Sequence, residues 1–134
     1  MENLSRQLKT TTKVSSVLER NTKEYGKQYL FDDKDDTCWN SDQGLPQWVW
    51  VEFESPVCLK AMEIQFQGGF AGQECVLTAE SEECRFYPKD NNSLQHFEIP
   101  EIKSKSFKLI IEKSTDFFGR IIIYKMNLLG NKLE

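Results

Sequence analysis

Alternation of apolar and polar side chains with a period of two is the feature of this sequence that most restricts its fold. It runs through residues 48–53, where Val49, Val51 and Phe53 are the apolar members, and it recurs through residues 61–66. Successive side chains of a β-strand point to opposite faces of a sheet, so this pattern predicts strands with one buried face. Further segments of strand composition are 14–17, 75–79, 85–87, 95–99, 107–111 and 121–129.

Short strands separated by turn residues account for most of the chain. Pro88 and Pro100 are expected to end two of these strands, because proline cannot donate a hydrogen bond to the sheet ladder. No long amphipathic helix interrupts the pattern. About eight short strands with frequent turns predict an all-β fold, an antiparallel β-sandwich of the jelly-roll type.

The length of 134 residues suits one domain with its own core. We expect the sandwich to span residues 13–134 and residues 1–12 to form a flexible N-terminal segment. No apolar run resembles a membrane span or a secretory signal. The expected location is therefore the nucleus and the cytoplasm, where thiols stay reduced.

Charge and cysteine spacing argue against two classes of function. The net charge is −4 and the basic residues are scattered, which argues against direct binding of nucleic acid. The four cysteines contain no C-x-x-C pair, so structural zinc is not indicated. Cys58 and Cys75 lie in or beside apolar runs and are expected to be buried.

Catalytic motifs are also missing from the sequence. The single histidine, His96, lies in a strand pattern, and an exposed strand position accounts for it. Residues 116–119 read Asp-Phe-Phe-Gly, but no kinase-type glycine-rich loop or catalytic loop accompanies them. The glycines of residues 68–72 are not followed by the helix of a phosphate-binding loop. We expect a protein without enzymatic activity.

Three segments around the first tryptophan carry a family resemblance. Leu-Phe-Asp at residues 30–32, Thr-Cys-Trp-Asn-Ser-Asp at 37–42 and Pro-Gln-Trp-Val at 46–49 precede an alternating strand. This order resembles the discoidin, or galactose-binding-like, family, which includes coagulation-factor C-type domains and the Doc domain of the anaphase-promoting complex. The resemblance implies a β-sandwich jelly roll, in agreement with the periodicity.

Five longer segments resemble the nuclear-receptor-associated members of this family. They are residues 14–32, 37–53, 64–70, 86–100 and 114–124. The resemblance implies a binding module whose partner is a nuclear receptor and which restrains transcription driven by that receptor. We expect a monomer that represses by blocking DNA binding of the receptor. The alternatives from other classes are a calcium- or carbohydrate-binding domain and a scaffold subunit of a larger assembly.

An acidic loop is the candidate for calcium. The oxygen donors that calcium prefers are supplied here by Asp32, Asp33, Asp35 and Thr37. The resemblance implies a ligand where Lys34 stands and another near Lys125, and an ammonium group at either place repels a cation. We therefore expect no cofactor, with Lys34 or Lys125 bridging the carboxylates in place of a metal.

Aromatic and polar residues at the same end are candidates for sugar binding. The set is Trp39, Asn40, Asp42, Phe70, Asn91 and Arg120. Trp39 is instead expected to plug the end of the sandwich, with its indole N–H bonded locally.

Protein recognition is the function that we predict for this end of the sandwich. Exposed aromatic side chains beside arginine are typical of interface anchors. The predicted surface, called here the loop-edge surface, consists of Asn40, Asp42, Gly68, Gly69, Phe70, Asn91, Phe117, Phe118 and Arg120. A structural role remains open for three of them: either Phe117 or Phe118 caps the core, and Arg120 forms an ion pair with Asp116 or Asp42.

Overall fold

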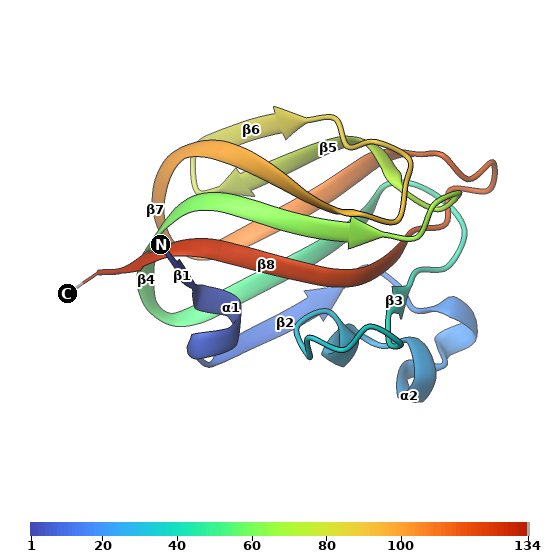
Figure 1. The fold of residues 1–134 in the computed structure, drawn as a ribbon, viewed down its shortest axis with the longest axis horizontal. Helices are drawn as coiled ribbons and strands as arrows, with labels where there is room; N and C mark the ends of the chain where they lie inside the picture. Colours follow the sequence, from blue (N-terminus) through green and yellow to red (C-terminus); the bar gives the residue numbers. More distant parts are fainter. Residues whose placement is uncertain (134) are drawn as a thin grey trace.

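The computed structural model describes residues 1–133 and shows a two-layered β-sandwich (Figure 1). The strands are β1 (Glu2–Asn3), β2 (Thr10–Val14), β3 (Trp39–Asn40), β4 (Gln47–Phe66), β5 (Gly72–Ala79), β6 (Glu82–Phe86), β7 (Leu94–Ser114) and β8 (Ile122–Lys132). The helical turns are α1 (Leu4–Gln7), η1 (Leu18–Arg20), α2 (Thr22–Tyr25) and η2 (Lys27–Tyr29). The all-β prediction is confirmed. Among the described residues, no helix is long and apolar enough to span a membrane.

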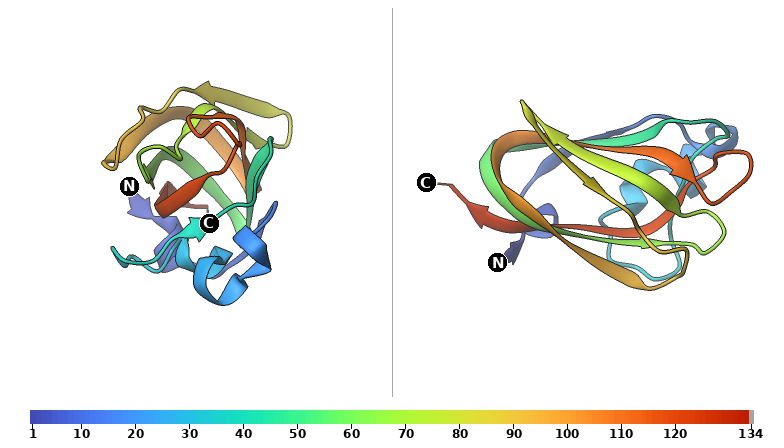
Figure 2. Two further views of the ribbon diagram at one scale, coloured as in Figure 1. Left: turned by 90° about the vertical axis from the view of Figure 1, so that its right-hand side faces the viewer. Right: turned by 90° about the horizontal axis from the view of Figure 1, so that it is seen from above.

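Two long strands bend and so belong to both layers (Figure 2). The first half of β4, residues 47–53, pairs with β2 and with the second half of β7. The second half of β4, residues 57–66, pairs with β8 and with the first half of β7. Pairing of β5 with β7 and of β6 with β5 completes one layer, and pairing of β1 and β3 with β8 completes the other.

Prolines mark the bends rather than the ends of these strands. Pro100 was expected to end a strand, but it lies inside β7, opposite the register shift between Leu59 and Ala61. Pro56 lies within the shift between Glu52 and Val57 of β4. A bulge leaves backbone groups outside the ladder, so a residue without an N–H costs nothing there. The pairs of strands predicted around each proline are therefore single bent strands.

The first twelve residues are part of the fold, in contrast to the flexible segment that we expected. β1 pairs with Leu129 and Gly130 of β8, and the Leu4 side chain is fully buried. The Leu128 N–H donates to the Ser5 hydroxyl at 3.1 Å. Burial of one leucine and pairing of the adjacent backbone hold this segment on the sandwich.

Trp39 plugs the sandwich as predicted. Its side chain has no exposed surface, and its indole Nε1 donates to the carbonyl oxygen of Ser16 at 2.9 Å. The core around it consists of apolar side chains from the inner faces of both layers. Cys58 and Cys75 are buried, also as predicted, and all four cysteines are free thiols.

Candidate protein-binding surface at one end of the sandwich

Three loops meet at the end of the sandwich opposite the two chain termini (Figure 1). The Gly44 N–H donates to the carbonyl oxygen of Phe118 at 2.8 Å, which joins the loop before β4 to the loop before β8. The loop before β5 joins the same group, because the Ala71 N–H donates to the Thr115 hydroxyl at 3.0 Å. The Ile122 N–H donates to the Phe70 carbonyl at 3.1 Å. Loops that are distant in sequence therefore form one continuous surface.

Two phenylalanines project from this surface. Phe117 is 93% exposed and Phe118 is 60% exposed, and their rings pack edge to face with centroids 5.2 Å apart. Leu45, 42% exposed, belongs to the adjoining loop. Neither phenylalanine caps the core, so that expectation was wrong. We call Leu45, Phe117 and Phe118 the aromatic knob.

A tight turn directs the aromatic knob outward. Asp116 begins the turn: its carboxylate accepts the Arg120 N–H at 3.0 Å, and its carbonyl accepts the Gly119 N–H at 3.1 Å. Gly119 has a φ of +80°, and a side chain there would lie 3.0 Å from the Leu45 Cγ atom. Glycine is suited to both constraints. The knob is therefore held by a hydrogen-bonded turn.

Arg120 does not form the ion pair that we expected. Its guanidinium lies over the Phe70 ring, with Cζ 4.9 Å from the centroid, and Nη2 donates to Asn40 Oδ1 at 2.9 Å. Asp116 bonds the backbone of Arg120 instead, and within residues 1–133 no ion pair links Arg120 to Asp116 or Asp42. The Nε atom of Arg120 is buried and has no partner within that range. A neutral amide and an aromatic ring thus replace the expected carboxylate.

The glycines of the loop before β5 are held by the loop before β7. The Gly69 N–H donates to the Asp90 carboxylate at 2.8 Å, and the Gly68 N–H donates to Asn92. Asn91 was predicted to lie on the loop-edge surface. Its side-chain oxygen accepts a hydrogen bond from the Ser93 N–H at 3.0 Å. Asn91 therefore stabilises its own turn, while Asp90 and Asn92 shape the surface.

Gln47 is a structural residue of the site that sequence reasoning missed. It is 4% exposed, and its Nε2 donates to the carbonyl oxygens of Asp42 and Gly44 at 3.2 and 2.7 Å. Its Oε1 accepts the hydroxyl of Ser16 at 2.8 Å. The Asp42 N–H in turn donates to the Ser16 hydroxyl oxygen at 2.9 Å. The sequence did contain a signal for this role. Gln47 lies on the apolar face of an alternating strand, and a buried amide there needs hydrogen-bond partners.

Lys125 bridges two carboxylates of the acidic loop. Its Nζ lies 3.3 Å from Asp33 Oδ1 and 3.2 Å from Asp35 Oδ1, and Arg6 also contacts Asp33. Hydrogen bonding to Asp35, and then to Asp33, raises the pKa of Lys125 above its usual value. Asp32 accepts the Thr37 hydroxyl at 2.6 Å and the Lys34 N–H at 3.1 Å. Across residues 1–133, no group of three acidic, histidine or cysteine side chains is arranged to hold a metal ion.

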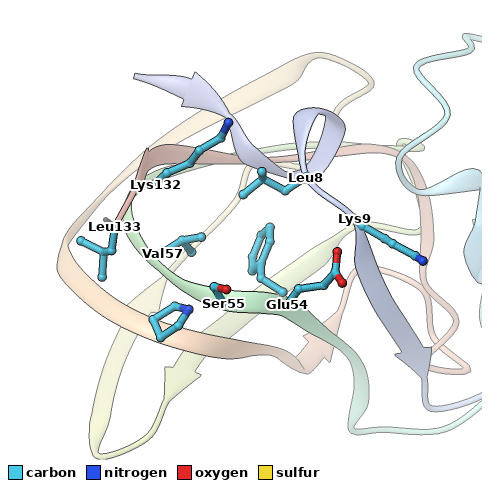
Figure 3. Close-up of a pocket in the computed structure, with 9 residues that line it drawn as sticks. Leu8, Lys9, Glu54, Ser55, Val57, Lys132 and Leu133 are labelled. Carbon is cyan, nitrogen blue, oxygen red and sulfur yellow. The ribbon is translucent and has the colours of Figure 1, made fainter.

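A hollow of about 310 Å³ lies at the other end, beside the chain termini (Figure 3). Leu8 and Val57 line it together with Lys9, Lys132 and Glu54, so its charges are of both signs. It contains none of the residues of the loop-edge surface.

Comparison with curated proteins identifies close relatives. The chain is 48% identical over 130 residues to the nuclear receptor 2C2-associated protein of Danio rerio, covering 92% of each chain. It is 48% identical over 131 residues to the protein of that name from Bos taurus, covering 93% of this chain and 94% of the relative. The Homo sapiens protein is 46% identical over 130 residues, with coverage of 92% and 94%. No family model matches the chain.

Comparison with solved structures confirms the fold. The C-terminal domain of a chitobiase from Bacteroides fragilis superposes with a TM-score of 0.82 at 13% identity, over 99% of this chain and all of that one. An F5/8 type C domain from the same organism gives 0.78 at 18% identity, over 92% and 93%. A Clostridium perfringens protein in complex with GalNAc-β-1,3-galactose gives 0.74 at 16% identity, over 90% and 95%.

Proposed function

Because the chain belongs to the family of the nuclear receptor 2C2-associated proteins, we propose that it is a non-catalytic module that binds a nuclear receptor. The main support for the location of the binding site is the aromatic knob, whose two phenylalanines are exposed on a hydrogen-bonded turn. Large aromatic side chains supply much of the energy of protein interfaces, and an ordered turn reduces the entropy lost on binding. The loop-edge surface is therefore the proposed receptor site.

The surroundings of the knob suit a protein interface. Arg120 and Phe70 lie next to it and add a cation over an aromatic ring, and the Asp90 carboxylate that accepts the Gly69 N–H adds a further polar group. An apolar centre with polar groups around it is the usual arrangement at protein interfaces. The partner surface that fits is an apolar cleft with a hydrogen-bond acceptor at its rim.

Repression by steric occlusion is the proposed consequence of binding. The net charge of −4 gives the chain no general attraction for phosphates, so it does not compete for DNA directly. Bound to the receptor, it covers the surface that the receptor uses for DNA. We further propose that the chain acts as a monomer in the nucleus and cytoplasm and without a cofactor, with Lys125 supplying the positive charge of the acidic loop.

The test is a binding and displacement experiment with the full chain and nuclear receptor 2C2 from the same organism. Calorimetry measures the affinity, and a gel-shift assay measures the fraction of receptor bound to its DNA element. We expect saturable binding and a loss of the receptor–DNA band as the chain is added. A stable complex of chain, receptor and DNA would retain the interaction but contradict occlusion.

Matched variants locate the contact. Phe117→Ser with Phe118→Ser removes the knob, and we expect at least a tenfold loss of affinity, about 1.4 kcal/mol. Leu133→Ser removes an exposed apolar side chain at the opposite end of the sandwich, 39% exposed, and is expected to bind normally. Equal losses of affinity in the double variant and in this control would contradict the proposed site.

Carbohydrate binding is a second candidate, favoured by one observation at the same surface. The buried Arg120 Nε has no partner within residues 1–133, beside the Phe70 ring and the Asn40 amide. If the Arg120 side chain turns outward, this donor and the Phe70 ring become accessible, and a sugar hydroxyl can then accept the hydrogen bond while the sugar ring packs against Phe70. The test is an NMR titration with galactose and with GalNAc-β-1,3-galactose that follows the Arg120 Nε–H signal. Saturable shifts there support the second candidate, and unchanged spectra exclude these two sugars.

A further inference from the structure

The outer edge of β2 is an unpaired strand edge. β2 pairs with β4 on one side only, and the Ser15 N–H donates to the Trp48 carbonyl at 3.0 Å at the end of that ladder. Ladder bonds alternate along an antiparallel strand, so the backbone groups of Thr12 and Val14 point away from β4. Within residues 1–133, no backbone bond outside the ladder uses those groups. A strand edge of this kind can pair with another extended chain.

Two hollows lie side by side along this edge. One, of about 400 Å³, is lined by Lys13, Val14, Val17, Thr22, Lys27, Gln28 and Trp48. The other, of about 420 Å³, is lined by residues 10–12, Lys27, Gln28 and Phe31. Lys27 and Gln28 of η2 border both hollows, so the two adjoin each other. We call the combined feature the β2 groove.

The groove carries positive charge on an otherwise acidic protein. Lys13 and Lys27 line the groove, and Lys13 Nζ lies 5.2 Å from the centroid of Trp50. Lys108 lies outside the groove lining, with Nζ 4.8 Å from the centroid of Trp48. Among residues 1–133, none of these lysines forms an ion pair. The chain as a whole has a net charge of −4. The groove is therefore a local basic site that complements an acidic ligand.

The apolar part of the groove lies within reach of these charges. Val14 and Val17 are only partly buried against the core, and Trp48 is half-buried on the adjoining strand. In an extended peptide, side chains alternate between two faces. Lys13 shares the outer face of the sheet with Trp48 and Trp50, whereas Val14 lies on the inner face. A segment with acidic residues on one face and apolar residues on the other therefore matches Lys13 on the outer face and the valines on the inner face.

We propose that the β2 groove binds an extended acidic segment of a partner protein, which pairs with the free edge of β2. Its carboxylates contact Lys13 and Lys27, and an apolar side chain enters the hollow formed by Val14, Val17 and Trp48. This surface is distinct from the loop-edge surface, and the inference does not depend on the proposed receptor site.

The experiment titrates the full chain with a labelled peptide of alternating glutamate and valine. We expect saturable binding that weakens as salt is added, because screening reduces the attraction between the charges. In amide NMR spectra the largest shifts are expected at Thr12, Val14 and the Trp48 indole. A peptide with lysine in place of glutamate is expected not to bind. Shifts centred on Phe70 or Phe117 would overturn the proposal.

Variants and modified peptides test the two parts of the contact. Lys13→Glu with Lys27→Glu is expected to weaken binding by at least about tenfold, whereas Lys89→Glu, an exposed lysine between β6 and β7, leaves it unchanged. Two peptides are compared, each N-methylated at every second peptide bond but at opposite positions. The peptide whose methyl groups replace the N–H groups facing β2 is expected not to bind, and the other is expected to bind normally. Equal losses for both peptides would exclude strand pairing, and equal binding of a single-stranded oligonucleotide would show a general anion site instead.

Discussion

The guanidinium of Arg120 lies over the ring of Phe70, with Cζ 4.9 Å from the centroid, and this pair joins the loop before β5 to the loop before β8. Asn40, the last residue of β3, extends the contact to the start of the loop before β4, because its side-chain oxygen accepts a hydrogen bond from Arg120. Asn40 is 4% exposed, so the bond is shielded from water. One arginine therefore helps to hold the three loops of the proposed receptor site together.

Replacing this arginine is expected to reduce stability. Arg120→Met keeps an unbranched side chain over Phe70 but leaves the buried oxygen of Asn40 without a donor. The expected loss in the free energy of unfolding is about 1–3 kcal/mol, measured by urea denaturation. Arg85→Met is the control, because Arg85 pairs with Glu112 at the exposed surface, where loss of an ion pair has little effect on stability. Equal losses would mean that the Asn40 contact has no structural importance.

The aromatic knob is expected to contribute to binding and little to stability. Phe117→Ser with Phe118→Ser removes two exposed rings whose edge-to-face contact is mostly with each other. The expected change in the free energy of unfolding is about 1 kcal/mol or less, measured by urea denaturation. A larger loss would show that the rings stabilise the loops. Weaker receptor binding by this variant would then report disruption of the loops and not the loss of a direct contact.

Removal of the buried tryptophan is expected to be severe. Trp39→Ala empties a site with no exposed surface and deletes the hydrogen bond to Ser16, at an expected cost of about 3–5 kcal/mol. Thermal and urea denaturation both measure this. Trp50→Ala serves for comparison, since that ring is half-buried on the outer face and contacts Lys13. A small effect of Trp39→Ala would contradict its assignment as the plug of the sandwich.

His96 is expected to give stability a pH dependence. Hydrogen bonds to Glu63, and then to Glu98, raise its pKa above the usual 6.5. A group whose pKa is raised on folding stabilises the folded state fully below the unfolded pKa, and this contribution disappears as the pH rises through the folded pKa. His96→Gln is expected to flatten the stability profile in that range, measured by urea denaturation at several pH values. An unchanged profile would show that other groups cause the dependence.

Calcium is expected to leave the acidic loop unchanged. Lys125 already lies 3.3 and 3.2 Å from the carboxylates of Asp33 and Asp35, and a divalent cation at that position meets an ammonium group. Amide NMR spectra of residues 32–37 are therefore expected to show no saturable shift as calcium is added. Lys125→Ser removes the ammonium group, and calcium-dependent shifts in that variant alone would show directly that the lysine replaces a cation.

Sequence reasoning was most successful where a local pattern has one physical meaning. Alternation through residues 48–53 indicates a strand with one buried face, and Trp39, expected from its place at the start of the sheet to plug the sandwich, is buried. The bridge from Lys125 to the acidic loop was one of two alternatives, and the structure selects it over Lys34. Of the loop-edge surface, the sequence indicated Phe70, Phe117, Phe118 and Arg120 from composition alone.

By itself the sequence determined the all-β class, the burial of Trp39 and the set of loops that carry aromatic and polar residues, because periodicity and side-chain chemistry act locally. Only the tertiary structure decided that Pro100 bends a strand instead of ending it, that Leu4 anchors the N-terminal segment and that Arg120 bonds Asn40 and not a carboxylate. Asn40 and Arg120 are 80 positions apart. Which groups meet over such separations depends on how the strands pair and bend, and no local pattern in the chain encodes that choice.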